Sequence, residues 1–267
     1  MNKRDKKIKI IGLIPARLKS TRIPEKALAD ICGLPMVVHT YLRSCYANLL
    51  DDVYVVTDST RIRDDVLAYG GKVLLSRRDH NCGTNRIAEI AEEMDCDIVV
   101  NIQGDEPLVN PEHIDEIIKP LINNPSIKVS VGVTPYQKKN STSDIKAVLD
   151  LEGNILYCSR NDIPSDARTP VSTLLKMCFI VPCRRDFLLE FAGWEPSPLE
   201  QIEFIEHLRI LEHGVKMRAV HLDKAHISVD TYDELTEVRK LMENDILFKK
   251  YAQIRSQPNF RINPERM

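Results

Sequence analysis

The sequence predicts an α/β protein with a mostly parallel central sheet and helices on both faces of that sheet. Short runs rich in Val and Ile recur along the first half of the chain, and stretches with helical spacing of apolar residues lie between them. Strands that alternate with helices form right-handed crossovers, which place the strands parallel in one sheet. With 267 residues and neither a low-complexity linker nor an internal repeat, we expect a single domain, 1–267, with an insertion.

The expected elements of the first half are bounded by turn residues. The strands are the apolar runs Ile10–Ile14, Val53–Thr57, Lys72–Ser76, Asp97–Ile102 and Lys128–Thr134. The helices have apolar residues at helical spacing, in Pro35–Asn48, Arg61–Tyr69, Asn85–Met94 and Pro111–Asn123. Asn110 is a favourable N-cap for the last of these helices, and proline fits its first position.

The rhythm changes in the second half, where turn-prone clusters separate shorter apolar runs. We interpret about residues 135–190 as a β-rich excursion with a mixed sheet. Its expected strands are Ala147–Asp150, Ile155–Cys158 and Met177–Cys183. Helical periodicity then returns in Arg185–Phe191, Pro198–Glu212 and Asp233–Asn244.

Composition and charge argue against several classes of protein. Lys and Arg total 37 against 39 Asp and Glu, a net charge of −2, which gives no support to nucleic-acid binding. The apolar runs are far shorter than a membrane span, and the basic segment Asn2–Lys9 is not followed by a signal-peptide apolar region. Seven cysteines, an odd number without a Cys-x-x-Cys pair, indicate reduced thiols in a cytoplasmic protein.

The segment Ile14–Lys26 is the most informative for function. It follows the first expected strand and combines cations, hydroxyl side chains and flanking prolines, namely Arg17, Lys19, Arg22, Lys26, Ser20, Thr21, Pro15 and Pro24. Loops at the carboxyl ends of parallel strands bind ligands in open α/β sheets. Guanidinium, ammonium and hydroxyl donors suit a polyanion, so we expect a phosphate site here. The alternative interpretation is a solvated basic turn.

Two acids from distant segments are candidate metal ligands. Asp105 follows Gly104 at the end of a buried strand, and Asp230 follows a short apolar strand at Ile227–Val229. Mg²⁺ takes one or two carboxylates together with phosphate oxygens, so the two acids predict a magnesium site if they converge. The alternative is that each acid only caps the helix that follows it.

A third segment, His80–Arg86, joins a strand to a helix. Gly83 and Thr84 suit a tight turn, and Arg86 falls in the first turn of the helix. His80 by itself is more often structural than catalytic. Together the three segments predict a nucleoside triphosphate site with a divalent metal, although the chain has neither the P-loop nor the dinucleotide-binding glycine motif.

An ordered series of motifs adds a family resemblance. The motifs are Ile-Pro-Ala-Arg-x-x-Ser-Thr-Arg at 14–22, Gly-Leu-Pro-Met at 33–36, Val-Thr-Asp at 56–58, Gly-Thr-x-Arg at 83–86, Asn-Ile-Gln-Gly-Asp-Glu-Pro at 101–107, Ser-Arg-x-x-Ile-Pro at 159–164, Pro-Leu-Glu at 198–200, Leu-Arg-x-Leu-Glu at 208–212 and Val-Asp-Thr at 229–231. From Ile11 to about Met242 the chain resembles the 3-deoxy-manno-octulosonate cytidylyltransferases, or CMP-KDO synthetases. The resemblance implies a Rossmann-like nucleotidyltransferase fold and a homodimer built through the β-rich excursion. It also implies Mg²⁺-dependent transfer of CMP from CTP to an acidic sugar, with release of pyrophosphate.

The resemblance further implies roles for single residues. The catalytic set is Arg17, Lys26, Asp105 and Asp230, of which Asp105 and Asp230 would ligate Mg²⁺. The nucleotide-binding set is Pro15, Ala16, Arg17, Ser20, Thr21, Arg22, Lys26, His80, Cys82, Gly83, Thr84, Arg86 and Gln103. The acceptor-binding set is Arg160, Met177, Glu206 and His207, with Arg160 facing the carboxylate of the acceptor.

Departures from the family pattern cluster in the acceptor half. In the run Lys176–Arg184, Met177 replaces a family histidine, Phe179 a glycine and Val181 a tyrosine, and His207 stands where glutamine is usual. Smaller departures affect the nucleotide half, at Glu25, Ala27, Cys82 and Asn85. We expect Met177, Phe179 and Val181 to alternate along one strand and share one apolar face, which would weaken the binding of a polyol. The alternative is drift within one activity, with His207 compensating for the lost histidine.

The identity of the acceptor therefore stays open. Our first choice is 3-deoxy-manno-octulosonate, and the alternatives are another 2-keto-3-deoxy sugar acid or a phosphonate. A non-catalytic nucleotide-binding protein is a remote alternative. We expect CTP and a small acidic acceptor as partners, Mg²⁺ as cofactor, and neither nucleic acid nor membrane.

Overall fold

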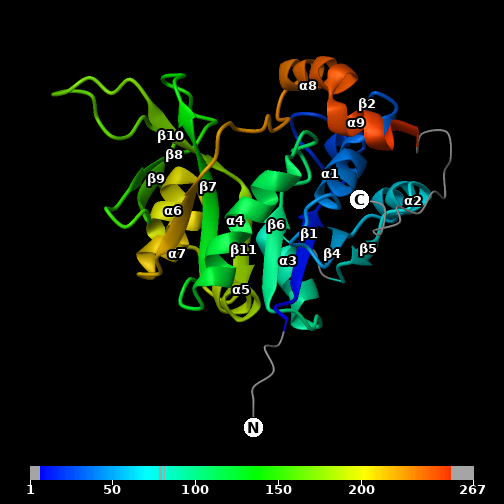
Figure 1. Cartoon of the computed structure of the whole chain (residues 1–267), viewed down its shortest axis with the longest axis horizontal. Coiled ribbons are helices and arrows are strands. Elements are labelled where there is room, and N and C mark those ends of the chain that lie inside the picture. The colour runs from blue at the N-terminus through cyan, green and yellow to red at the C-terminus, as the bar shows by residue number, and fades with distance from the viewer. Residues whose placement is uncertain (1–6, 78–79, 81, 254–267) are drawn as a thin grey trace, which may run out of the picture. The chain divides into compact units, whose positions relative to one another are not determined.

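The computed structural model describes residues 7–77, 80 and 82–253, which group into two compact units (Figure 1). Unit 1 consists of the described residues of Met1–Asp115 and His226–Met267. Unit 2 is Glu116–Ala225, so it is inserted into the sequence of unit 1.

Unit 1 contains the predicted parallel sheet. Its strands are β1 (Ile10–Pro15), β4 (Asp52–Thr57), β5 (Val73–Leu75) and β6 (Ile98–Ile102), in the order β5-β4-β1-β6. All three pairings are parallel, and β1 lies between β4 and β6. Every residue of β6 is buried, as expected for a central strand with both faces covered.

The helices of unit 1 follow the predicted alternation. They are α1 (Met36–Ser44), α2 (Thr60–Ala68), α3 (Gly83–Glu92), α8 (Tyr232–Asn244) and α9 (Ile246–Tyr251), and α4 (Pro111–Asn123) begins here and ends in unit 2. A 3₁₀ turn (η1, Lys26–Leu28) and a hairpin of β2 (Asp30–Ile31) and β3 (Leu34–Pro35) lie between β1 and α1. We had not predicted η1, this hairpin or α9, which are all too short to show a clear periodicity.

Unit 2 is the β-rich part of the chain. Its strands are β7 (Val129–Tyr136), β8 (Lys146–Leu149), β9 (Ile155–Ser159), β10 (Leu174–Cys178), β11 (Ile180–Arg184) and β12 (Met217–His221). They pair in the order β11-β7-β10-β8-β9, and β12 pairs with β7. Only the β12–β7 pairing is parallel among these. Three short helices complete the unit, α5 (Arg185–Ala192), α6 (Pro198–Glu203) and α7 (His207–Glu212).

Three expected elements differ from the structure. The strand expected at Met177–Cys183 is broken into β10 and β11, because Cys178 lies opposite Gly132 whereas Cys183 lies opposite Val129, so that the strand bulges near Phe179. The helix expected at Pro198–Glu212 is interrupted by Phe204. Its left-handed backbone, with φ of 54°, ends α6.

The third difference is that Ile227–Val229 forms no strand, and the strand of this region is β12, at Met217–His221. None of the described helices is long and apolar enough to span a membrane. All seven cysteines lie in the described part of the chain, and none of them forms a disulfide bond.

Candidate active site

A lysine between two carboxylates forms the centre of the candidate site in unit 1. The Nζ atom of Lys26 lies 2.7 Å from Oδ2 of Asp105 and 3.0 Å from Oδ1 of Asp230. Arg22 adds a second cation, with Nη2 also 3.0 Å from Oδ1 of Asp230. The side chain of Lys26 is only 16% exposed, and those of the two acids are 27% and 29% exposed. The two acids that we predicted as a converging pair therefore meet on one cation.

The backbone around Asp105 requires a close approach to the first strand. A Cβ atom on Gly104 would lie 2.9 Å from the carbonyl oxygen of Pro15, so a larger residue would displace the loop. On its other side, the backbone N–H of Val229 donates to the carbonyl of Asp105 at 2.9 Å. Asp105 is thus held between β1 and the segment that carries Asp230.

Neither Asp105 nor Asp230 caps the helix that follows it, because other residues cap α4 and α8. Thr231 is the N-cap of α8 and forms a capping box with Glu234. Asn110 precedes α4, and its Oδ1 accepts from the backbone N–H of Glu112 at 3.1 Å. The alternative interpretation of Asp105 and Asp230 as mere helix caps is therefore wrong, and their carboxylates contact Lys26 instead.

The electrostatics of the cluster keep Lys26 charged. Burial lowers the pKa of Lys26, but the carboxylates of Asp105 and Asp230 more than offset this effect, and the pKa is raised above its ordinary 10.5. One lysine and two carboxylates carry a net charge of −1 near neutral pH, and Arg22 balances it. A ligand with many negative charges would need an additional cation here.

The basic loop is fixed at two points and exposed between them. Ala16 is buried and donates its backbone N–H to the carbonyl of Val56 at 2.9 Å, and Ile23 is buried. Arg17, Thr21 and Arg22 are exposed between these anchors. Pro15 and Ser20 are half-buried. The loop therefore offers donors to solvent beside the cluster of Lys26.

The third predicted segment, His80–Arg86, is tied to the sheet and to α3. His80 pairs with Glu89, Nε2 to Oε2 at 2.6 Å, and both side chains are nearly buried. Arg86 is 3% exposed and donates to Ser76 Oγ at 2.7 Å and to Asp58 Oδ2 at 3.0 Å. Asn81 lies outside the described residues.

The start of α3 corrects the predicted turn. Gly83 and Thr84 already belong to α3, and Cys82 is its N-cap, with Sγ accepting from the backbone N–H of Asn85 at 3.4 Å. A Cβ atom on Gly83 would lie 3.0 Å from Cγ of Pro15, so this helix start lies against the basic loop. Gln103 is half-buried, with Nε2 3.5 Å from Oδ1 of Asn101.

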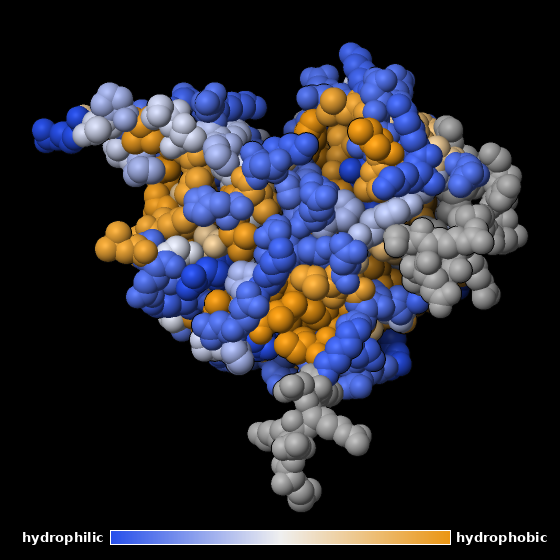
Figure 2. All heavy atoms as spheres, in the orientation of Figure 1, coloured by the Kyte–Doolittle hydropathy of each residue, from blue (hydrophilic) through white to orange (hydrophobic). Residues whose placement is uncertain are grey.

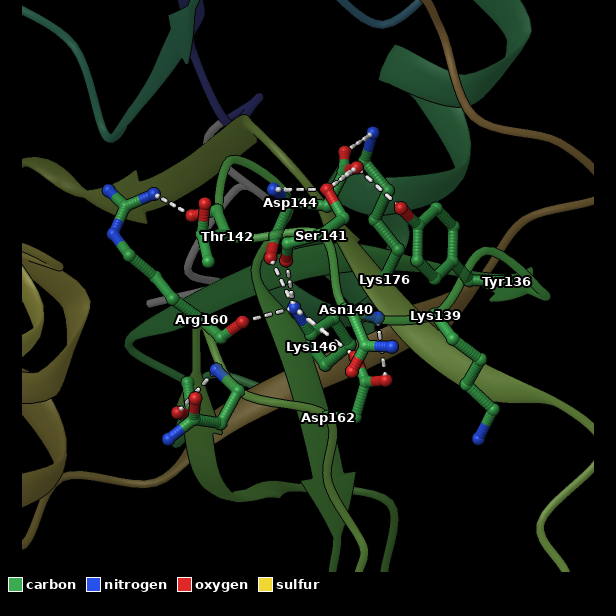
Figure 3. Close-up of polar contacts among 12 residues, drawn as sticks. Tyr136, Lys139, Asn140, Ser141, Thr142, Asp144, Lys146, Arg160, Asp162 and Lys176 are labelled. Carbon is green, nitrogen blue, oxygen red and sulfur yellow. Dashed lines mark hydrogen bonds and ion pairs between the residues drawn. The ribbon is translucent and has the colours of Figure 1, made fainter.

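Arg160, predicted to face the acceptor, binds backbone carbonyls of unit 2. Its Nε donates to the carbonyl of Glu203 at 2.8 Å and its Nη2 to that of Phe204 at 3.1 Å. Its Nη1 donates to the carbonyl of Thr142 at 3.0 Å (Figure 3). The guanidinium thus joins the loop before β8 to the end of α6, and its role toward a carboxylate stays a prediction.

The remaining acceptor candidates are largely buried. Met177 has no exposed area and His207 is 7% exposed, whereas Glu206 is half-buried. Burial lowers the pKa of His207, and its ring centroid lies 5.6 Å from that of Phe179. The expectation that Met177, Phe179 and Val181 alternate along one unbroken strand is wrong, because the strand breaks at Phe179.

Sequence reasoning missed Lys146, the most buried cation of unit 2. Its side chain has no exposed area, and Nζ donates to the carbonyls of Ser141 at 2.5 Å, of Asp144 at 2.9 Å and of Arg160 (Figure 3). Oδ1 of Asp162 lies 3.6 Å away. Burial lowers the pKa of Lys146. The available signal was a charged residue inside the apolar run Ile145–Leu149.

Comparisons with known proteins identify the family of the chain. The family model described as cytidylyltransferase matches residues 11–217. The 3-deoxy-manno-octulosonate cytidylyltransferases of Geobacter metallireducens and Geobacter sulfurreducens are each 42% identical to the chain. Each alignment covers 86% of this chain, and 96% and 97% respectively of the relative.

A solved structure gives the same result. CMP:2-keto-3-deoxy-manno-octonic acid synthetase complexed with CTP superposes with a TM-score of 0.84 at 34% sequence identity, over 88% of this chain and 98% of that chain. The predicted α/β nucleotidyltransferase fold is thereby confirmed. The chain belongs to the cytidylyltransferase family, in its 3-deoxy-manno-octulosonate cytidylyltransferase branch, and is a CTP-dependent nucleotidyltransferase.

Proposed function

We propose that this enzyme transfers CMP from CTP to 3-deoxy-manno-octulosonate and releases pyrophosphate. The observation that carries the proposal is the convergence of Asp105 and Asp230 on Lys26, beside a loop of exposed cations. The acceptor follows the names of the relatives that cover most of the chain. The reaction would serve lipopolysaccharide biosynthesis.

The residues of the loop would bind and orient the triphosphate. Arg17 and Arg22 would hold phosphate oxygens, together with the hydroxyls of Ser20 and Thr21. Lys26, kept charged by its two carboxylates, would stabilise the negative charge that develops during transfer. A hydroxyl oxygen of the acceptor attacks the α-phosphorus in line, and the bond from that phosphorus to the pyrophosphate oxygen breaks. No covalent intermediate on the enzyme is needed.

Asp105 and Asp230 fit a magnesium ion in charge and chemistry. Among the described residues no group of three or more His, Cys, Asp or Glu side chains gathers that could hold a metal by itself. A pair of carboxylates that shares its metal with phosphate oxygens and water is the arrangement Mg²⁺ usually adopts with nucleotides. When bound, the ion would neutralise phosphate charge and act as a Lewis acid.

The base and the ribose would contact the segment His80–Arg86 and Gln103. Pro15, Ala16, Cys82, Gly83 and Thr84 would line this region through their backbone and small side chains. This assignment is supported by the contact of the start of α3 with Pro15. CTP would be preferred over purine nucleotides.

The acceptor would bind through Arg160, Met177, Glu206 and His207 of unit 2. A different acidic acceptor is the second candidate, and it is favoured by the buried Met177 and by the ring contact between Phe179 and His207. Met177 and Val181 offer fewer hydrogen bonds to a polyol than the histidine and tyrosine that the family pattern has at these two positions.

Assembly and location belong to the same proposal. We place the homodimer contact on unit 2, where Leu156, Ile202 and Phe204 are 60%, 74% and 83% exposed. Figure 2 shows apolar residues gathered over β9 and α6. Such exposed patches commonly mark interfaces. Both units would act as one nucleotidyltransferase domain in the cytoplasm, where CTP is made.

The test is a coupled assay of pyrophosphate release by the purified protein. With CTP and Mg²⁺ we expect release to depend on 3-deoxy-manno-octulosonate, and CMP-sugar to be the second product by mass spectrometry. A panel of other 2-keto-3-deoxy acids and phosphonates runs in parallel. Faster release with another acid would replace the acceptor, and no release with any acid would refute the proposal.

A further inference from the structure

Two histidines outside the reacting groups lie in contact within unit 1. Nδ1 of His113, in the first turn of α4, lies 2.9 Å from Nε2 of His226. Their ring centroids are 4.7 Å apart with an interplanar angle of 44°. His113 is 5% exposed and His226 is half-buried. The two histidines therefore form a largely buried contact and not a contact between exposed surface side chains.

A backbone group completes the contact. The N–H of Asn110 donates to the same Nε2 of His226, at 3.4 Å. A neutral imidazole has one nitrogen that accepts and one that donates. Both contacts are satisfied together when Nε2 of His226 accepts and Nδ1 of His113 donates. We call these three residues, Asn110, His113 and His226, the histidine clamp.

The clamp joins the two stretches of chain that carry the carboxylates. Asn110 and His113 follow Asp105 along one stretch, and His226 precedes Asp230 along the other. Between the clamp and the carboxylates, the N–H of Val229 donates to the carbonyl of Asp105 at 2.9 Å. The two stretches are thus connected at two successive points.

The second stretch, residues 226–230, has no regular secondary structure. No ladder of backbone hydrogen bonds therefore sets its position. Beyond Asp230 the chain is fixed again, because the backbone N–H of Asp230 donates to Oε2 of Glu234 at 2.7 Å. The placement of Asp230 therefore depends on α8 at one end and on the clamp at the other, together with its own side-chain contacts to Arg22 and Lys26.

We propose that the histidine clamp positions Asp230 opposite Asp105 and thereby sets the affinity of the pair for a divalent cation. The proposal rests on the proposed function, in which the two acids share one metal. His113 and His226 are positioning residues, since neither touches the reacting groups. Supports behind metal ligands commonly influence metal affinity because small displacements of a ligand weaken its bond.

Paired substitutions separate the hydrogen bonds from the shape of the rings. His226→Phe keeps a planar ring and removes the accepting nitrogen. His226→Gln places an amide oxygen near the position of Nε2, where it can accept from both donors. His113→Leu and His113→Asn form the same contrast on α4, since Asn retains a donor near the position of Nδ1. His221→Ala, at an exposed histidine of β12, is the matched control.

Three measurements test the proposal. Hydrogen exchange reports the backbone amides of residues 226–231, and Mn²⁺ titration followed by electron paramagnetic resonance in the presence of CTP reports metal affinity without turnover. The third is the Mg²⁺ concentration that gives half of the maximal rate. For His226→Phe we expect faster exchange at Val229 and metal affinity weaker by on the order of 10-fold. The maximal rate at saturating Mg²⁺ should change much less.

The results for these variants test the role of the histidine clamp independently of the acceptor that the enzyme uses. His226→Gln should restore exchange and metal affinity to near the wild-type values, and His221→Ala should change neither. Unchanged Mn²⁺ affinity in His226→Phe, or equal losses in His226→Phe and His226→Gln, would overturn the proposal. If His226→Phe does not fold, the two His113 variants make the same comparison. Failure of the proposed function would instead show as wild-type protein inactive with every acceptor, while exchange and Mn²⁺ binding still judge the clamp.

Discussion

At the scale of single residues, the meeting of Asp105 and Asp230 on Lys26 leads to a direct test. Asp105→Asn removes one anionic ligand at constant volume, so we expect turnover to fall by about 100-fold or more, as for other losses of catalytic charge stabilisation. The melting temperature should change little, because Asp105 is partly exposed. The measurement is pyrophosphate release at saturating CTP and Mg²⁺.

The matched control for this variant is Asp233→Asn, since Asp233 is exposed in the first turn of α8. It removes the same charge near the site without removing a contact to Lys26. Activity of Asp105→Asn within about tenfold of wild type would contradict the assignment of Asp105.

Lys146 provides the stability prediction at this scale. Lys146→Met keeps most of the volume and leaves the carbonyls of Ser141, Asp144 and Arg160 without their donor. Buried acceptors without partners are costly, so we expect the free energy of unfolding to fall by about 2–4 kcal/mol. Urea unfolding measures this change. Lys216→Met, at a lysine 67% exposed, should cost far less, and equal losses in both variants would contradict the structural role of Lys146.

Because His207 is buried, we expect the free energy of unfolding to depend on pH. Burial lowers its pKa in the folded protein below the ordinary 6.5, so below pH 6.5 the unfolded chain binds more protons than the folded protein. Stability contributed by the neutral ring is therefore present above pH 6.5 and is lost as the pH falls toward the folded pKa. His207→Gln should lose less unfolding free energy than wild type between pH 7 and pH 5. Parallel pH curves for the two proteins in urea unfolding would contradict this explanation.

At the scale of elements, the loop between β1 and α1 holds a conformation that suits glycine. Glu25 precedes η1 with φ of 52°, and its carboxylate pairs with Arg61. A left-handed backbone at a residue with a Cβ costs roughly 1–2 kcal/mol, and an exposed ion pair contributes about 0–1 kcal/mol. We expect Glu25→Gly to raise the free energy of unfolding slightly, by up to about 1 kcal/mol.

Glu25→Ala separates the two effects, because it removes the ion pair and keeps the Cβ. It should be less stable than Glu25→Gly in the same denaturation experiment. If the alanine variant is as stable as the glycine variant, the backbone of Glu25 carries no strain.

The sequence predicted most elements because their patterns are local. The strand at Ile10–Ile14 and the helix at Pro111–Asn123 were recognisable from apolar periodicity and caps, and both are present. The break between β10 and β11 at Phe179 could not be recognised from the sequence, because a bulge depends on how these strands pair with β7. The break at Phe204 depends on a left-handed backbone that phenylalanine rarely adopts, so its sequence contains no warning.

In the candidate site, too, some features could be predicted from the sequence and others could not. Asp105 and Asp230 were recognised as acids that could converge, and their carboxylates do lie close to each other, on the Nζ atom of Lys26. The contact of both acids with Lys26 was not predicted. Lys146 was missed because its role depends on how the neighbouring turns fold their carbonyls around its Nζ atom. The histidine clamp was missed because its two rings are 113 positions apart in the sequence. Residue type alone could not show that Arg160 joins two segments of its own unit by donating to their carbonyls.

At the scale of the whole molecule, the exposed apolar residues of unit 2 predict the oligomeric state. If Leu156, Ile202 and Phe204 form a dimer contact, Ile202→Asp should shift the protein to monomer, because burying an unpaired charge is costly. Sedimentation velocity over a range of concentrations measures this shift. Leu241→Asp, at a leucine of α8 that is 47% exposed, is the control and should leave the distribution unchanged. A wild-type monomer, or a dimer that survives Ile202→Asp, would contradict the proposed interface.

The insertion of unit 2 between the two carboxylates has a consequence for biosynthesis. Lys26 and Asp230 are 204 positions apart, whereas Lys26 and Asp105 are 79 apart. A chain still on the ribosome therefore has its phosphate loop and first acid long before the second acid emerges. If the two acids share one metal as proposed, chains that stop within unit 2 possess only one of its two carboxylate ligands, and we expect them not to consume CTP. On this proposal, catalytic competence requires that unit 2 and the segment carrying Asp230 have both been made.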